Sequence, residues 1–243
     1  MMKKVAIVQS NYIPWKGYFD LIASVDEFVL YDDVQFTKND WRNRNRLKTP
    51  QGATWLTIPV THRFGQLIQD TMVSNLAWSK KHWGNIRQSY TSTLHFKEYA
   101  PLFERLYREI ASERYLSAIN YRFLREICLI LGIKTPITWS RDYRFINGQT
   151  ERLVDICRQA GASEYLSGPN ARKYLKEKCF SDAGIKLTYI DYLGYAPYRQ
   201  LYPPFEHAVS ILDLIFNEGP DAPKYLKNLV GRISRKLEAG TTQ

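Results

Sequence analysis

The chain has 243 residues, enough for one large α/β domain or for a domain with an insertion. Its 34 basic and 24 acidic residues give a net charge of +10, which favours an anionic partner such as nucleic acid, a nucleotide, a phosphorylated sugar or an anionic membrane surface. The three cysteines lack metal-ligand spacing, and no apolar stretch approaches the ~20 residues of a membrane span, so we expect a cytoplasmic protein with free thiols and no metal site.

The first elements lie within residues 5–36. The apolar run 5–8 predicts a strand, apolar residues between 15 and 25 recur at helical spacing, and the run 28–30 predicts a second strand. Strand, helix and strand in this order are typical of a βαβ unit. We therefore predict an α/β fold, Rossmann-like, with a mostly parallel sheet, helices on both faces and a helical insertion.

Polar side chains follow both predicted strands, at the carboxyl ends where parallel sheets bind ligands. From these clusters we predict five ligand-binding residues: Gln9, Asn11, Tyr12, Trp15 and Gln35. Asp32 and Asp33 are candidate catalytic groups, because paired carboxylates tend to separate in pKa and one can then serve as a base. The alternative is that they cap a turn or pair with nearby arginines.

A basic segment follows at residues 37–48. Arg42, Arg44 and Arg46 alternate with two asparagines, and on an extended chain this alternation puts guanidinium groups on one face and amides on the other. Guanidinium forks bind phosphate or carboxylate, so Arg42, Asn43, Arg44 and Lys48 are predicted to bind an anionic substrate. The alternative is a solvated basic edge that resists aggregation.

The remaining elements return to alternating strands and helices after a helical stretch. Residues 54–60 predict a buried strand, and His62 at its end is a further candidate base. Helices follow over 78–131, with Pro101 as a start and Gly132 as a stop. We then expect strands at 136–140, 164–166 and 185–192, and helices at 149–161, 171–178 and 208–216. This divides the chain into a first half of the α/β domain (1–75), a helical insertion (76–133), a second half (134–220) and a basic, fraying tail (221–243).

The turn after the strand at 164–166 resembles an anion site. Ser167 and Gly168 precede a predicted helix start, where free N–H groups and the helix dipole favour a phosphate. Arg172 lies in that first turn, where a cation opposes the dipole, and a bound phosphate would account for it. An ordinary helix cap with solvated basic residues is the alternative.

Several of these segments together resemble the WbqC-like family of bacteria. The resemblance rests on QSNYIPWKGYFDLI, FVLYDDVQFTKNDWRNRNRLKTPQG, WLTIPV, YLSG and the segment around Arg199. It implies a place among the proteins of O-antigen and other surface polysaccharide synthesis, acting on amino sugars. A fainter resemblance is to the nucleotidyltransferase and pantothenate synthetase superfamily. That superfamily's two phosphate-binding histidines are absent here, since the corresponding positions are Pro14 or Trp15 and Tyr18.

Two functions remain in competition. The first is an enzyme that transfers an acyl or aminoacyl group to the amine of a nucleotide-linked amino sugar, with ATP or an acyl thioester supplying activation. The second is a non-catalytic module that binds nucleotide sugars or glycans. Nucleic acid is the less favoured partner, because the sequence has no glycine–aromatic RNA motif and no helix-turn-helix signal. Neither the cofactor nor the oligomeric state follows from the sequence.

Overall fold

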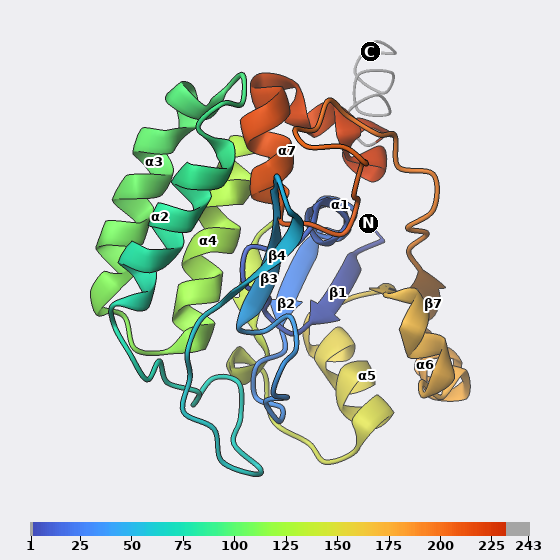
Figure 1. Cartoon of the computed structure of the whole chain (residues 1–243). Coiled ribbons are helices and arrows are strands. Elements are labelled where there is room, and N and C mark those ends of the chain that lie inside the picture. The colour runs from blue at the N-terminus through green and yellow to red at the C-terminus, as the bar shows by residue number, and fades with distance from the viewer. Residues whose placement is uncertain (1, 232–243) are drawn as a thin grey trace.

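The computed structural model describes residues 2–231, and the part of the predicted tail at 232–243 lies outside that range. Its centre is a parallel sheet, in which five strands are ordered β5-β2-β1-β6-β7. The strands are β1 (Lys4–Val8), β2 (Glu27–Leu30), β5 (Ile137–Trp139), β6 (Glu164–Ser167) and β7 (Lys186–Tyr189). The predicted α/β architecture is confirmed, with helices on both faces (Figure 1).

The two faces of the sheet follow from alternation along the strands. On β1, Val5 and Ile7 pack into a core shared with α5 (Gln149–Gln159) and α6 (Glu177–Asp182), whereas Ala6 joins the core of α1 (Lys16–Ala23) and α7 (Ile211–Glu218). Because successive side chains point to opposite faces, a fully apolar strand must be covered on both sides. The short apolar run of β1 is therefore the signature of a buried central strand.

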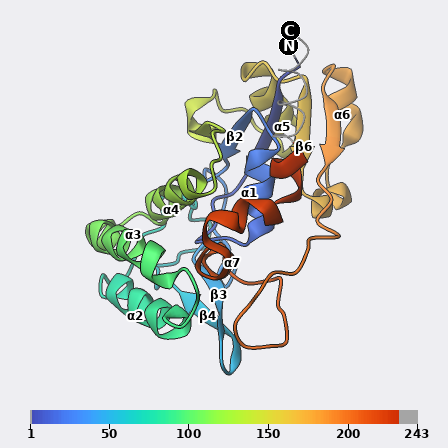
Figure 2. The same cartoon turned by 90° about the horizontal axis from the view of Figure 1, so that it is seen from above.

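Three helices lie beside the sheet as a separate layer in both views (Figures 1 and 2). They are α2 (Trp78–Tyr90), α3 (Phe96–Glu109) and α4 (Leu116–Ile130), and the short 3₁₀ helix η1 (Ile110–Ser112) follows α3. The predicted start at Pro101 is wrong, because this proline lies inside α3. The predicted stop is confirmed: α4 ends at Ile130, and Gly132 has a φ of 69°, a left-handed conformation that favours glycine.

A hairpin stands apart from the main sheet. Its strands, β3 (Arg44–Thr49) and β4 (Gly52–Thr57), form a two-stranded antiparallel sheet. The prediction of a buried strand over 54–60 is therefore wrong: in β4 only Leu56 is buried, and Trp55 is 44% exposed. Alternation alone could not tell a strand of the main sheet from one of a surface hairpin.

Three more 3₁₀ helices connect the second half: η2 (Ser140–Asp142), η3 (Pro169–Lys173) and η4 (Gly219–Tyr225). A single helix over 171–178 is wrong, because η3 ends at Lys173 and α6 begins only at Glu177. The tail predicted to fray begins in ordered structure, since Leu226 and Leu229 are buried.

A long loop, residues 192–209, runs from β7 to α7 and passes beside the β3–β4 hairpin (Figure 2). Its end is fixed where Ser210 N donates to Arg46 O at 2.9 Å and Ser210 Oγ donates to Ile13 O at 2.8 Å. We call this segment the 192–209 loop. Within residues 2–231, no helix has the length and apolar character needed to cross a membrane.

Candidate functional site

Three segments meet at the carboxyl edge of the two central strands. Val8 of β1 is in register with Leu30 of β2, so the loops that follow lie side by side. Ser10 N donates to Asp32 Oδ1 at 2.7 Å, which joins the two loops. Asn120 of α4 donates to Ser10 Oγ at 3.0 Å and to the carbonyl of Arg42 at 2.9 Å, so the segment before β3 is held there too.

The Arg42 guanidinium is the positive group at this edge. Nη1 donates to Asn11 Oδ1 and Nη2 donates to Gln9 Oε1, both of them neutral acceptors. Asp40 lies 3.4 Å from Nη2, and despite its own burial the pKa of Asp40 is lowered, chiefly by Arg42. The structure therefore brings together three of the residues predicted to bind substrate: Gln9, Asn11 and Arg42.

A hollow of about 220 Å³ opens beside this cluster. Trp15, at the N-cap of α1, forms one wall, and no side chain caps the helix there. Gly17 permits this arrangement, since a Cβ at that position would lie 2.3 Å from the Trp15 ring. Aromatic walls with amide groups beside them are typical of sites for flat polar rings. The complete lining is Asn11, Pro14, Trp15, Trp41, Asn45 and Ala208.

The other two arginines lie on the outer face of the hairpin. The Arg44 guanidinium stacks on the Trp55 ring, 4.0 Å from its centroid, and Trp41 lies 5.4 Å from the same ring. Arg46 Nε donates to the carbonyl of Ala208 at 2.9 Å, a residue that lines the hollow. The expected alternation holds for Arg44 and Arg46, but Arg42 precedes β3 and turns toward the loop after β1.

The remaining polar residues of this segment are internal. Lys48 is 4% exposed and its Nζ donates to the carbonyl of Pro204. Asn43 Nδ2 donates to Ile58 O at 2.9 Å, and Tyr12 Oη contacts His82 and Tyr107 inside the core. The structure thus places Lys48, Asn43 and Tyr12 in the interior, away from the lining of the hollow.

The two predicted catalytic carboxylates point in opposite directions. Asp32 is buried, and its oxygens accept from Ser10 N and from Ser117 Oγ of α4. Burial raises the pKa of Asp32, although these hydrogen bonds oppose the increase. Asp33 forms an ion pair with Arg152 of α5 and accepts from Ser140 Oγ at 2.5 Å. Both carboxylates therefore hold neighbouring elements in place.

Gln35 and His62 are exposed on two neighbouring loops, the one between β2 and β3 and the one between β4 and α2. The His62 ring packs 5.7 Å from that of Phe36, and Gln35 forms an antiparallel bridge with Leu67. Neither residue lines the hollow beside Arg42.

The predicted Ser167–Gly168 anion site lies on the strand next to β1. Ser167 is buried and its Oγ donates to Tyr165 Oη at 3.4 Å, while Gly168 is the N-cap of η3. The Arg172 guanidinium stacks 4.0 Å above the Tyr189 ring. The turn is therefore part of the same carboxyl edge, but it ends in a short 3₁₀ helix instead of an α-helix.

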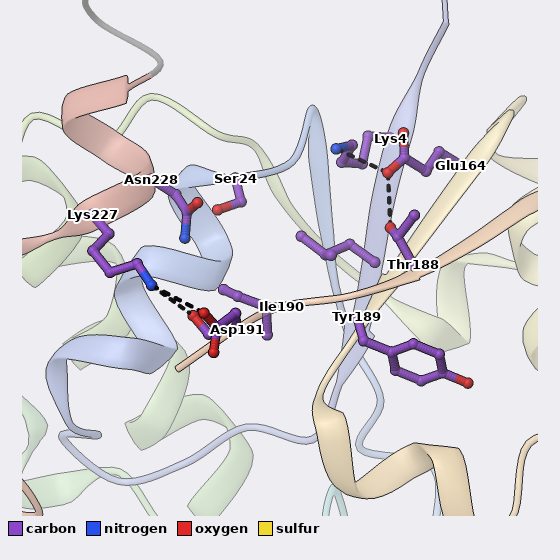
Figure 3. Close-up of a pocket in the computed structure, with 10 residues that line it drawn as sticks. Lys4, Ser24, Glu164, Thr188, Tyr189, Ile190, Asp191, Lys227 and Asn228 are labelled. Atoms are coloured by element: carbon purple, nitrogen blue, oxygen red, sulfur yellow. Dashed lines mark hydrogen bonds and ion pairs between the residues drawn. The ribbon is translucent and has the colours of Figure 1, made fainter. Parts of the chain in front are cut away.

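A second hollow, of about 370 Å³, lies over β6 and β7 (Figure 3). Lys4 pairs with Glu164 at 2.9 Å on one side, and Lys227 pairs with Asp191 at 3.5 Å on the other. Both cations are thus held by carboxylates of the same hollow. Arg42 also lies 3.4 Å from a carboxylate, that of Asp40, but it donates its hydrogen bonds to the neutral amides of Asn11 and Gln9, so we place the candidate anion site at Arg42.

Sequence reasoning missed Asn120 and the lining role of Trp41. Asn120 is fully buried within an apolar stripe of α4 that includes Leu116, Phe123 and Leu124. A polar residue at such a position needs buried hydrogen-bond partners, and this requirement could have marked Asn120 in the sequence. Trp41 is 40% exposed next to Arg42, and its contact with the hollow depends on the distant Trp15 and Ala208.

Comparison with known proteins places the chain in a family. The model of the WbqC-like protein family matches residues 9–225. The chain belongs to the WbqC-like family. A relative in Mycobacterium tuberculosis (strain ATCC 25618 / H37Rv), the uncharacterized protein Rv1507c, is 53% identical over 228 residues, which cover 93% of this chain and 98% of that protein. No solved structure matches the chain. The family match includes Gln9, Asn11, Arg42 and all the residues that line the hollow beside them.

Proposed function

We propose that this WbqC-like protein is an enzyme of surface polysaccharide synthesis that transfers an acyl or aminoacyl group to the amine of a nucleotide-linked amino sugar. The observation that carries the proposal is the position of Arg42 beside a tryptophan-lined hollow at the carboxyl edge of β1. A nucleotide sugar combines flat rings with phosphates, and this site combines flat apolar walls with a guanidinium group.

The ligand would occupy the site by exchanging hydrogen bonds. Arg42 now donates to two neutral amide oxygens, and a phosphate oxygen is a stronger acceptor for the same N–H groups. The uncapped N-terminus of α1 lies at the hollow and adds its partial positive charge. Asn11 and Gln9 would then turn to polar groups of the sugar.

Amide formation sets the chemistry that the site must supply. The sugar amine attacks the carbonyl carbon of an activated acyl group, the bond from that carbon to its phosphate or thiolate leaving group breaks, and a base takes the ammonium proton. We assign Asp32 and Asp33 to organising this edge, because one carboxylate fixes Ser10 and the other fixes Arg152. His62 stays the predicted base only if its loop moves toward the hollow when substrate binds.

A non-catalytic nucleotide-sugar or glycan binding module is the second candidate. The favouring observation is that Asp32 and Asp33 are already engaged in hydrogen bonds or an ion pair, and that His62 lies outside the hollow. Both functions require the same ligand site and differ only in turnover.

The test has two stages. Thermal denaturation is first measured with uridine diphosphate hexosamines, ATP and acyl thioesters, because a ligand that binds only the native state raises the melting temperature. The stabilising nucleotide sugar is then incubated with each activated donor, and the product is examined by mass spectrometry. The enzyme proposal predicts an amide-linked product. Binding without any product would support the binding module, and the absence of nucleotide-sugar binding would contradict both.

A further inference from the structure

A third hollow lies at the carboxyl edge of β2 and β5. It measures about 480 Å³ and is formed by the loop before α2, the start of α4 and the end of β5. It is separate from the hollow beside Arg42, with which it shares no lining residue. Its lining is Gln69, Asp70, Glu113, Tyr115, Ser117, Ala118, Trp139 and Arg141.

Arg141 gives this hollow a positive group that is held in place. Its guanidinium stacks 4.4 Å above the Trp139 ring, and Tyr121 packs on the same indole at 5.3 Å. Asp142 fixes the turn by accepting from Trp139 N at 3.0 Å. Within residues 2–231, no acidic side chain forms an ion pair with Arg141. A stacked guanidinium keeps its N–H edge available for the two oxygens of a carboxylate.

Two acidic side chains line the same hollow. Glu113 Oε1 accepts from the backbone N–H groups of Arg114 and Tyr115, at 2.7 and 2.8 Å, which fixes its carboxylate just before α4. The Asp70 carboxylate is exposed and has no hydrogen-bond or ion-pair partner within residues 2–231. A guanidinium and two carboxylates in one hollow, none of them paired with another, match a small molecule that carries both charges.

The floor of the hollow leads toward the central loops. Ser117 is buried there and donates its hydroxyl to Asp32, whose other oxygen accepts from Ser10 N in the loop after β1. The same loop carries Asn11, which lines the hollow beside Arg42. Two hydrogen bonds through Asp32 and the backbone from Ser10 to Asn11 therefore connect the two hollows.

We propose that the hollow between β5 and α4 binds a free α-amino acid, with its carboxylate on Arg141 and its ammonium group at Asp70 and Glu113. The aromatic rings of Tyr115 and Trp139 would contact the side chain of this ligand. Binding itself does not depend on the proposed function. The role of the amino acid as the group transferred to the sugar does rest on it.

Isothermal titration calorimetry with the full chain tests the proposal directly. The twenty free L-amino acids are titrated one at a time, and those that bind are repeated as the N-acetyl acid and as the α-carboxamide. We expect binding of at least one amino acid, and a loss of about tenfold or more when either charge is removed. No binding, or a carboxamide that binds as well as its parent, would overturn the proposal.

Variants separate this site from the one beside Arg42. Arg141→Gln and Asp70→Asn change exposed side chains and are expected to weaken amino-acid binding about tenfold or more while leaving nucleotide-sugar binding unchanged. Arg42→Gln is expected to do the reverse. Amino-acid binding that survives Arg141→Gln unchanged would refute the site. Nucleotide-sugar binding without amino-acid binding would refute this inference alone, whereas the opposite result would uphold it and refute the proposed function.

Discussion

Segment 42–48 has a basic residue at each end, Arg42 and Lys48, and the two side chains lie in different environments. Arg42 donates to two amide oxygens, one of them on Asn11, which lines the open hollow, and it lies 3.4 Å from Asp40. Lys48 is enclosed under the 192–209 loop, near Asp213. The first cation can exchange its neutral partners for a ligand, while the second serves to anchor the loop. A basic pattern in sequence thus does not tell a binding group from a structural one; what packs over it does.

The contacts around the enclosed Lys48 should contribute more to stability than those around Arg42. Asp213 is buried and accepts from Tyr198 Oη at 2.6 Å and Gln200 Nε2 at 2.7 Å, which fastens the 192–209 loop to α7. Asp213→Ala leaves both donors and the nearby Lys48 without this partner, so the free energy of unfolding should fall by about 3–5 kcal/mol in urea denaturation. Asp221→Ala, which removes an exposed pair with Lys224, is the matched control and should cost about 0–1 kcal/mol. Equal losses would contradict the contrast.

Asn120 connects the Arg42 end of the segment to α4, and its substitution should have an intermediate effect on stability. Asn120→Ala removes the donors to Ser10 Oγ and to the carbonyl of Arg42. We expect a loss of about 1–3 kcal/mol in the free energy of unfolding, because buried acceptors are left unsatisfied. Nucleotide-sugar affinity should fall as well, although Asn120 does not line the hollow. Normal affinity in the folded variant would show that Arg42 needs no such support.

The stability contributed by Asp213, beside the enclosed Lys48, should also depend on pH. Burial raises the pKa of Asp213 to about 6 from 3.8, so the native state binds this proton more readily than the unfolded chain. The contribution of Asp213 to stability therefore falls as pH rises from about 4 to 6. Urea denaturation of the protein and of Asp213→Asn across this window should show the difference, and parallel curves would contradict it.

Lys16 should give a dependence of stability on pH of the opposite sign. It is enclosed by Tyr195 and Tyr198, and burial lowers its pKa from 10.5 to about 8, against the attraction of Asp213 and Asp20. The native state therefore releases this proton first, and the contribution of Lys16 to stability rises between about pH 8 and 10.5. Denaturation of Lys16→Met should lack this rise. If the variant still became more stable over this pH range, the increase would come from another group.

The smallest effect is expected on the outer face of the hairpin. Arg44→Ala removes the stacking of a half-buried guanidinium on Trp55 and its hydrogen bond to the carbonyl of Asn39, together worth about 1 kcal/mol of stability. If Arg44 also binds the phosphates of the ligand, as the sequence predicts, calorimetry of the variant should show a loss of nucleotide-sugar affinity. Unchanged affinity would restrict the anion site to Arg42.

Local sequence patterns predicted the sheet and part of the candidate site for identifiable reasons. The apolar runs at 5–8 and 28–30 mark strands covered on both faces, and the polar residues after them had to meet at one edge. Asp32 and Asp33 follow the end of β2 and bond to different neighbouring elements. Their partners, Ser117 and Arg152, come from helices about a hundred residues away, and no local pattern could identify these contacts.

The central claim is that Arg42 and the hollow beside it bind a nucleotide-linked sugar. Calorimetric titration of a uridine diphosphate hexosamine into the protein, into Arg42→Gln and into the surface control Arg125→Gln tests it most directly. Loss of a charge-assisted hydrogen bond should weaken binding to Arg42→Gln by about 10- to 100-fold. Arg125 pairs only with the neighbouring Glu126 among residues 2–231, so its variant should bind as the parent does. Equal affinity of all three proteins would contradict the account.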